Sequence, residues 1–216
     1  NPDDMRAIRL ELATATHFAR RGSTLEWPEM DGSGAFDLLV EALGAPALEV
    51  ECKSVSDDKG RRVHRRDALI FYDRLWKKIS PLAPRLTKGL SVVVTVPERL
   101  PTRYVDRVSL AEQVGRQILV GCSSKLANGT EIRLAEFDST RLANIASETR
   151  PEILRAVVED VTATHNRNAM VVGTRSGGAL AIAVQSARDD APLEALFKTL
   201  GDASRRQFSG ARPALL

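Results

Sequence analysis

The chain has 216 residues, which is enough for one large domain or two small ones. Hydrophobic residues make up 43% and charged residues 27%, as expected of a soluble globular protein. Aromatic residues make up only 5%, which argues against the many-ringed stacking surface of a single-strand-binding module. The net charge of +3 permits a polyanionic partner without requiring one.

The two cysteines, Cys52 and Cys122, lie in no CxxC motif or Cys/His cluster, so the sequence predicts no zinc site. A cysteine count this low indicates a reducing compartment, and we expect a cytoplasmic protein. The sequence contains no run of about 18 apolar residues, so we expect no membrane-spanning segment.

Apolar periodicity, β-branched runs and turn residues predict helices and strands along the chain. In chain order we expect a helix over 3–21, strands over 23–27, 35–43 and 47–55, a helix over 63–79, a strand over 90–96, a helix over 102–119, a strand over 131–137, a helix over 151–162, a hairpin of strands 169–174 and 179–185, and a helix over 192–208. This order predicts one α/β domain with a mixed central sheet flanked by helices.

Acidic side chains gather on the hairpin formed by strands 35–43 and 47–55. Because side chains alternate along a strand, Glu49, Glu51 and Lys53 share one face, and Asp37 and Glu41 share a face of the preceding strand. A turn near residue 45 would place Asp37 opposite the stretch from Glu51 to Lys53, and Glu41 opposite Glu49. The hairpin therefore predicts a patch of carboxylates with one lysine.

Carboxylates that face each other across a hairpin repel, and a bound divalent cation would remove that repulsion. We expect Asp37 and Glu51 to bind Mg²⁺, which prefers carboxylate oxygens, and we expect Mn²⁺ to be able to replace it. The backbone carbonyl of Cys52 is a candidate third ligand. Lys53 is expected to orient the attacking water or to stabilise negative charge in the transition state.

The string Gly34-Ala35-Phe36-Asp37, then thirteen residues, then Glu51-Cys52-Lys53, resembles the motif of the PD-(D/E)xK nuclease superfamily. Phe36 stands where the family name has proline, and the helix after Lys53 lacks the glutamine motif of some exonuclease branches. Many members add a glutamate from the first helix, and Glu11 matches that place.

The resemblance implies a restriction-endonuclease-like fold, whose core runs helix, three-stranded meander, helix, strand. It implies a single domain over 1–216. The catalytic core would cover about 3–96, and residues 97–216 would be an elaboration with an added C-terminal hairpin and helix. In this reading, Asp37, Glu51, Lys53 and Glu11 are the catalytic residues.

The resemblance also implies a Mg²⁺-dependent deoxyribonuclease that hydrolyses DNA phosphodiester bonds, and we expect an endonuclease in a restriction, phage-defence or toxin/effector setting. Double-strand cleavage by this fold often implies a homodimer, and the apolar stretch 213–216 suggests a further domain. Two alternatives stay open. The fold can lose activity and keep a nucleic-acid or partner surface, or the acidic hairpin can be coincidental in a structural protein.

A basic run follows the acidic hairpin and is a candidate DNA contact. Its members are Lys59, Arg61, Arg62, Arg65 and Arg66. Basic residues at the start of a helix oppose the helix dipole, and this small cost suggests that the charge has a use. Contacts of this kind would bind phosphates and position the duplex without reading its sequence.

Overall fold

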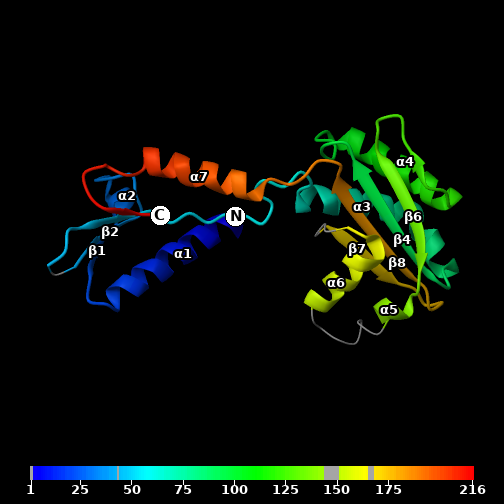
Figure 1. The fold of residues 1–216 in the computed structure, drawn as a ribbon, viewed down its shortest axis with the longest axis horizontal. Coiled ribbons are helices and arrows are strands. Elements are labelled where there is room, and N and C mark those ends of the chain that lie inside the picture. Colours follow the sequence, from blue (N-terminus) through cyan, green and yellow to red (C-terminus); the bar gives the residue numbers. More distant parts are fainter. Residues whose placement is uncertain (1, 43, 144–150, 165–167) are drawn as a thin grey trace. The chain divides into compact units, whose positions relative to one another are not determined.

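The computed structural model describes residues 2–42, 44–143, 151–164 and 168–216, and the chain forms two compact units (Figure 1). Residues 1–60 and 191–216 form unit 1, and residues 61–190 form unit 2. Unit 2 is therefore an insertion in the sequence of unit 1. None of the described helices is long and apolar enough to cross a membrane.

Unit 1 contains a four-stranded sheet and its helices. Its elements are α1 (Pro2–Ala19), β1 (Thr24–Glu26), α2 (Pro28–Asp31), β2 (Leu38–Glu41), β3 (Leu48–Val50), α7 (Pro192–Arg206) and β9 (Ala214–Leu215). The strand order is β1-β2-β3-β9, in which β1, β2 and β3 form an antiparallel meander and β9 runs parallel to β3. A helix and a strand that follow unit 2 thus complete a sheet that begins before it.

One face of this sheet is apolar and packs against α1. Leu38, Val40 and Val50 are buried on that face, because residues two apart in a strand point the same way. Ala15 and Phe18 of α1 lie against them. A slip of one residue in the β2–β3 pairing would turn this apolar set to the other face, so the core fixes the register.

The observed β2–β3 register differs from the expected one. Leu39 pairs with Glu49, so the prediction that Glu41 lies opposite Glu49 is wrong. The pairing is centred on Gly44, one residue before the expected turn near Ala45. Gly44 has a φ of 78°, in the left-handed region that glycine adopts without strain, so the chain can turn there at little cost.

Unit 2 contains a five-stranded mixed sheet with helices packed on it. Its elements are α3 (Arg65–Ile79), a 3-10 helix η1 (Ser80–Arg85), β4 (Gly89–Val96), α4 (Tyr104–Val120), β5 (Ser124–Lys125), β6 (Glu131–Phe137), α5 (Thr140–Ala143), α6 (Pro151–Thr162), β7 (Ala169–Gly173) and β8 (Ala179–Ser186). The strand order is β5-β6-β4-β8-β7. The central strands β4 and β8 run parallel, and the other pairs are antiparallel.

The main core of unit 2 lies between its sheet and the helices α3 and α4. Phe71 and Leu75 of α3 and Val114 of α4 are completely buried against Val92 of β4 and Ile182 of β8. A second apolar cluster, which includes residues of α5 and α6, covers other residues of the same sheet. The near-continuous apolar sequence of β4 is thus explained by burial on both faces.

The mixed α/β class expected from the sequence is confirmed, whereas the domain layout differs from the expected one. Helix α3 and strand β4, which were expected to complete a core over 3–96, belong to unit 2, and residues 97–216 are divided between both units. β4 pairs with β6 and β8 instead of with the acidic hairpin. Periodicity identifies a strand, but tertiary packing decides which strand it pairs with.

We predict that two leucines of α3 differ sharply in their contribution to the stability of unit 2. Leu75 is completely buried, so Leu75→Ala should lower the free energy of unfolding by about 2–5 kcal/mol. Leu69 is 57% exposed, so Leu69→Ala is the matched control. This change should alter the free energy of unfolding by less than about 0.5 kcal/mol. The free energy of unfolding of both variants is measured by urea unfolding, with hydrogen exchange of the unit 2 amides as the signal. Equal losses in the two variants would contradict the packing described here.

Candidate active site

Asp37 links the two halves of the acidic motif. It lies immediately before β2 and is only 7% exposed. Its carboxylate Oδ2 accepts a hydrogen bond from the backbone N–H of Cys52, with 2.5 Å between the two atoms. A hydrogen bond to a charged acceptor is stronger than a neutral one. The predicted meeting of Asp37 with the 51–53 stretch is therefore present in the structure.

Glu51 follows β3 directly, and its carboxylate is buried. The residue is 2% exposed, and its backbone N–H donates to the carbonyl of Leu215 at 2.9 Å, so β9 holds its main chain. The Lys53 ammonium group forms an ion pair with Glu51 Oε1. Within the described part of the chain, Glu51 Oε1 is contacted by Lys53, and Oε2 has no hydrogen-bond partner. A buried carboxylate with this free accepting capacity is suited to a further ligand.

Burial raises the pKa of Glu51 above its usual value, and the contact with Lys53 opposes that shift. The nearby carboxylates of Asp37 and Glu29 raise the same pKa further. Lys53 is partly exposed and compensates one negative charge of the group. The structure thus brings together Asp37, Glu51 and Lys53, as the sequence predicts.

Glu11 of α1 interacts electrostatically with the same group. Its pKa is raised first by burial, then by the charges of Asp37 and Glu29, while Lys53 lowers it. Charges act on each other in this way only at short range or through a low-dielectric interior. The charge of Asp37 therefore acts on Glu11, and the catalytic role that the resemblance gives Glu11 stays a prediction.

The sequence analysis did not identify Glu29 of α2, whose charge acts on both Glu11 and Glu51. Glu29 follows Pro28 and precedes the turn around Gly32, in a helix of four residues. The combination of an N-terminal proline, an acidic residue and a glycine C-cap is typical of a short helix. That pattern was available in the sequence, and it would have placed a further carboxylate beside the hairpin.

Cys52 lies between Glu51 and Lys53 and has a packing role. Its side chain contacts the apolar face of unit 1, as expected for a residue on the opposite face of the strand. Burial raises the pKa of its thiol, which disfavours the thiolate and argues against a nucleophile. Its backbone N–H holds Asp37, and its carbonyl remains the candidate metal ligand named above.

The fit of these residues to a divalent cation depends on the donor set. Asp37 and Glu51 offer hard oxygen donors, and Glu51 has free accepting capacity in a buried place. Among the described residues, however, no three or more His, Cys, Asp or Glu side chains are grouped closely enough to hold a metal ion. The residue types fit Mg²⁺, and Asp37, Glu51 and the backbone carbonyl of Cys52 are the groups that would hold it.

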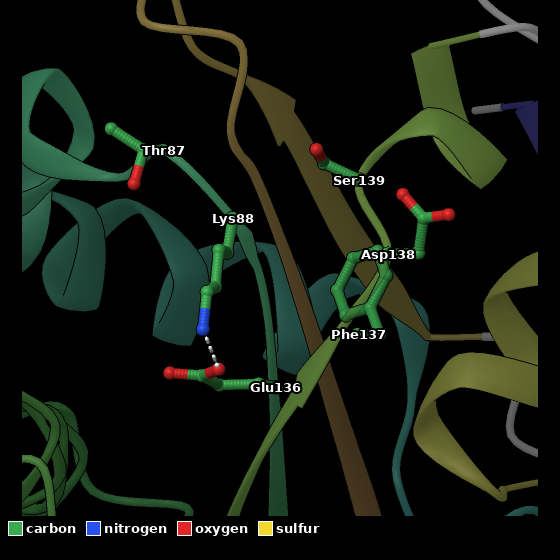
Figure 2. A pocket seen from close by; sticks show the side chains of 6 residues that line it. All are labelled: Thr87, Lys88, Glu136, Phe137, Asp138 and Ser139. Carbon is green, nitrogen blue, oxygen red and sulfur yellow. Dashed lines mark hydrogen bonds and ion pairs between the residues drawn. The ribbon is translucent and has the colours of Figure 1, made fainter.

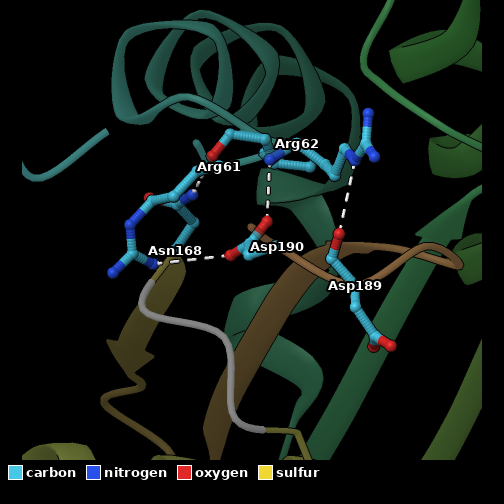
Figure 3. Close-up of polar contacts among 6 residues, drawn as sticks. Arg61, Arg62, Asn168, Asp189 and Asp190 are labelled. Carbon is cyan, nitrogen blue, oxygen red and sulfur yellow. Dashed lines mark hydrogen bonds and ion pairs between the residues drawn. The ribbon is translucent and has the colours of Figure 1, made fainter. Parts of the chain in front are cut away.

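The basic run is divided between the units. Lys59 belongs to unit 1, whereas the four arginines belong to unit 2. Arg61 and Arg62 contact Asp189 and Asp190 at the other end of unit 2 (Figure 3). The backbone N–H of Arg62 donates to Asp190 Oδ1 at 2.7 Å, its Nε donates to the carbonyl of Asp189 at 3.3 Å, and Arg61 Nη1 lies 3.8 Å from Asp190 Oδ2.

These contacts give Arg61 and Arg62 a structural role, because they hold the two ends of unit 2 together. The N–H of Ala191 donates to the carbonyl of Gly60 at 2.9 Å. Both residues belong to unit 1, and they flank the two ends of the segment that forms unit 2. Arg65 and Arg66 are exposed at the start of α3. Of the predicted DNA contacts in unit 2, this pair presents its side chains to solvent most openly.

Unit 2 has a surface cavity with a polar lining (Figure 2). It lies where β4 and β6 pair, and Lys88 Nζ donates to Glu136 Oε2 across it at 2.8 Å. Asp138 accepts from the backbone of Thr140, and Ser139 donates to a backbone carbonyl. These polar groups are engaged by the protein itself, so the cavity offers no evident chemistry.

Comparison of the chain with protein-family models, with curated proteins and with solved structures finds no match. The resemblance of the hairpin motif to a nuclease family therefore stays an expectation.

We predict that the buried charge of Glu51 costs stability at neutral pH. A carboxyl whose pKa is raised on folding favours the folded state at low pH, and this contribution is lost as the pH rises through the folded-state pKa. Glu51→Gln should therefore raise the free energy of unfolding at neutral pH. The gain should disappear as the pH falls to the ordinary glutamate value of 4.5.

Urea unfolding across a pH series measures this difference. The matched control is Glu41→Gln, because Glu41 is an exposed glutamate of the same hairpin and should show little effect at any pH. A Glu51→Gln protein that is less stable than the wild type at neutral pH would show that the ion pair with Lys53 outweighs the cost of burial.

Proposed function

We propose that unit 1 is a metal-dependent nuclease domain that hydrolyses DNA phosphodiester bonds. The observation that carries the proposal is the convergence of Asp37 and the Glu51-Cys52-Lys53 stretch. Asp37 is bonded to the main chain of Cys52, and Glu51 is buried beside Lys53. Acidic residues and a lysine, held on adjacent strands, form the arrangement that the PD-(D/E)xK resemblance leads us to expect.

The topology of unit 1 supports a restriction-endonuclease-like core. Its order is helix α1, the meander β1-β2-β3, helix α7 and strand β9, and β9 pairs with the strand that leads to Glu51. This is the order helix, three-stranded meander, helix, strand, with unit 2 inserted after the meander. The proposed catalytic core therefore consists of residues 1–60 and 191–216.

In the proposed mechanism, Asp37, Glu51 and the carbonyl of Cys52 would hold Mg²⁺ or Mn²⁺. Such an ion would supply activation of water and neutralisation of charge on the phosphate. Lys53 leaves its ion pair with Glu51 and donates a hydrogen bond from Nζ to a phosphate oxygen, where negative charge grows in the transition state. Glu11, whose pKa is raised, is assigned the role of accepting a proton from water at its carboxylate.

The second candidate is a binding module that has the same fold but no activity. Two observations favour it: the ion pair that occupies Glu51, and the absence of a grouped metal-ligand set among the described residues. The two functions differ in one measurable property. A nuclease breaks the phosphodiester bond when Mg²⁺ is present, whereas a binding module leaves the bond intact.

We predict that the purified protein converts supercoiled plasmid to nicked or linear DNA with Mg²⁺ and not with EDTA. Asp37→Asn, Glu51→Gln and Lys53→Ala should each lower the cleavage rate by at least about 10²-fold, since each removes a charge that acts on the transition state. Glu41→Gln is the control, because Glu41 is exposed and pairs away from the motif. Wild-type activity in the Glu51→Gln protein would refute the mechanism, and tight DNA binding without any cleavage would favour the binding module.

We also predict that Arg65 and Arg66 contribute phosphate contacts. Replacing both with alanine should lower DNA affinity equally for all sequences and reduce the slope of log K against log salt by about 1.8, since each phosphate contact contributes about 0.9. Arg61→Ala with Arg62→Ala should mainly lower stability, because these residues contact Asp189 and Asp190. Affinity measured across a salt series tests both, and an unchanged slope in the Arg65/Arg66 variant would contradict the prediction.

A further inference from the structure

Unit 1 contains a cavity of about 430 Å³ that the proposed mechanism does not use. It lies between the turn before β2, the sheet residues Leu39 and Glu49, and the segment that follows α7. Leu39 and Glu49 are Cα partners on the face opposite the apolar core. The cavity is thus formed by segments from both sides of the insertion.

Part of the cavity lining is apolar. Phe36, Phe208 and Pro28 line it, and Phe36 is 5% exposed. Gly34 allows this packing, because a Cβ atom there would lie 2.9 Å from Pro28 Cβ and 3.0 Å from Phe36 Cε1. Aromatic side chains give a nucleobase a surface on which to stack, whatever its identity.

The lining also carries cationic and amide groups. Arg206 is exposed, and the side chain of Arg212 is 47% exposed. Gln207 Oε1 is a buried acceptor without a hydrogen-bond partner in the described part of the chain. Arginine binds phosphate through paired N–H groups, and a glutamine amide can pair with the edge of a base.

Glu49 fixes the position of this polar segment. Its carboxylate is completely buried and accepts hydrogen bonds from the backbone N–H and the hydroxyl of Ser209, and Arg212 Nη1 lies 3.8 Å from Oε1. A buried charge needs such partners to be tolerated. Since Glu49 is satisfied by Ser209, the arginines keep exposed surface for a ligand.

The cavity is close to the motif residues. Phe36 is adjacent to Asp37, and Glu49 precedes Glu51 by two residues on the strand, which is roughly 7 Å along the chain. A group bound in the cavity would therefore lie beside whatever binds at Asp37 and Glu51, a separation suited to neighbouring parts of one polynucleotide.

We propose that this cavity binds one nucleotide of the DNA substrate, with its base against Phe36 and Phe208 and its phosphate at Arg206 and Arg212. The position of this nucleotide next to a cleaved bond rests on the proposed function, whereas the binding of a free nucleotide to the cavity does not. A base can enter such a cavity only if it has left the duplex. The substrate class is therefore DNA with an unpaired or extruded nucleotide next to the scissile phosphate.

The test measures binding of dAMP, dTMP and inorganic phosphate to the full chain in EDTA by NMR chemical-shift titration. Both nucleotides should bind at least tenfold more tightly than phosphate. Arg206→Ala should weaken nucleotide binding at least tenfold. Arg205→Ala removes the neighbouring arginine of α7, which does not line the cavity, and should leave binding unchanged.

Phe208→Ala should weaken binding of the nucleotides without affecting phosphate. Equal affinity for phosphate and nucleotides would overturn the proposal by showing a simple anion site, and equal losses in Arg205→Ala and Arg206→Ala would overturn it by showing nonspecific charge. Arg206→Ala leaves the Glu49 contacts intact, so loss of binding is separable from loss of folding.

The same titration on Asp37→Asn separates this inference from the proposed function. That variant should bind dAMP like the wild type while failing to cleave plasmid. Binding of nucleotides without Mg²⁺-dependent cleavage in the wild type would leave the subsite in place and refute the nuclease. Cleavage without nucleotide binding would refute the subsite and leave the nuclease in place.

Discussion

The hydrogen bond from the Cys52 amide to Asp37 is the constraint on which the arrangement of unit 1 depends. It can form only in the register that the apolar core imposes on β2 and β3, since Leu38 and Val50 are paired and buried. That register in turn decides which carboxylates come together. Packing of the apolar core thereby decides which carboxylates come together, and burial together with the charges of Asp37 and Glu29 raises the pKa values of Glu11 and Glu51.

Much of this arrangement could be predicted from the sequence, because it depends on local patterns. Strand alternation was enough to bring Asp37 to Glu51 and Lys53, and the helical periodicity was enough to place Glu11 on the first helix. The exact register was not predictable, because the chain can turn at Gly44 or at Ala45, and only the packed core discriminates between them.

The strands that pair with the acidic β2–β3 hairpin could not be predicted, for a physical reason. Helix α3 and strand β4 are the next elements along the chain, and neighbours in sequence usually pack together. β4 instead pairs with β6 and with β8, a long apolar strand that is largely buried, and the hairpin receives the two-residue strand β9. The burial of Glu49 could not be predicted either, because its partners Ser209 and Arg212 come from the distant C-terminal segment.

The insertion of unit 2 also sets the order of events during synthesis. At about 5–20 residues per second, the ribosome needs on the order of ten seconds to pass from β3 to α7 and β9. During that interval the edge of β3 that later receives β9 is unpaired, and such an edge is a template for aggregation. Glu49, Glu51 and Lys53 place charges along it. The residues proposed for hydrolysis would thus also keep nascent chains apart until the sheet is complete.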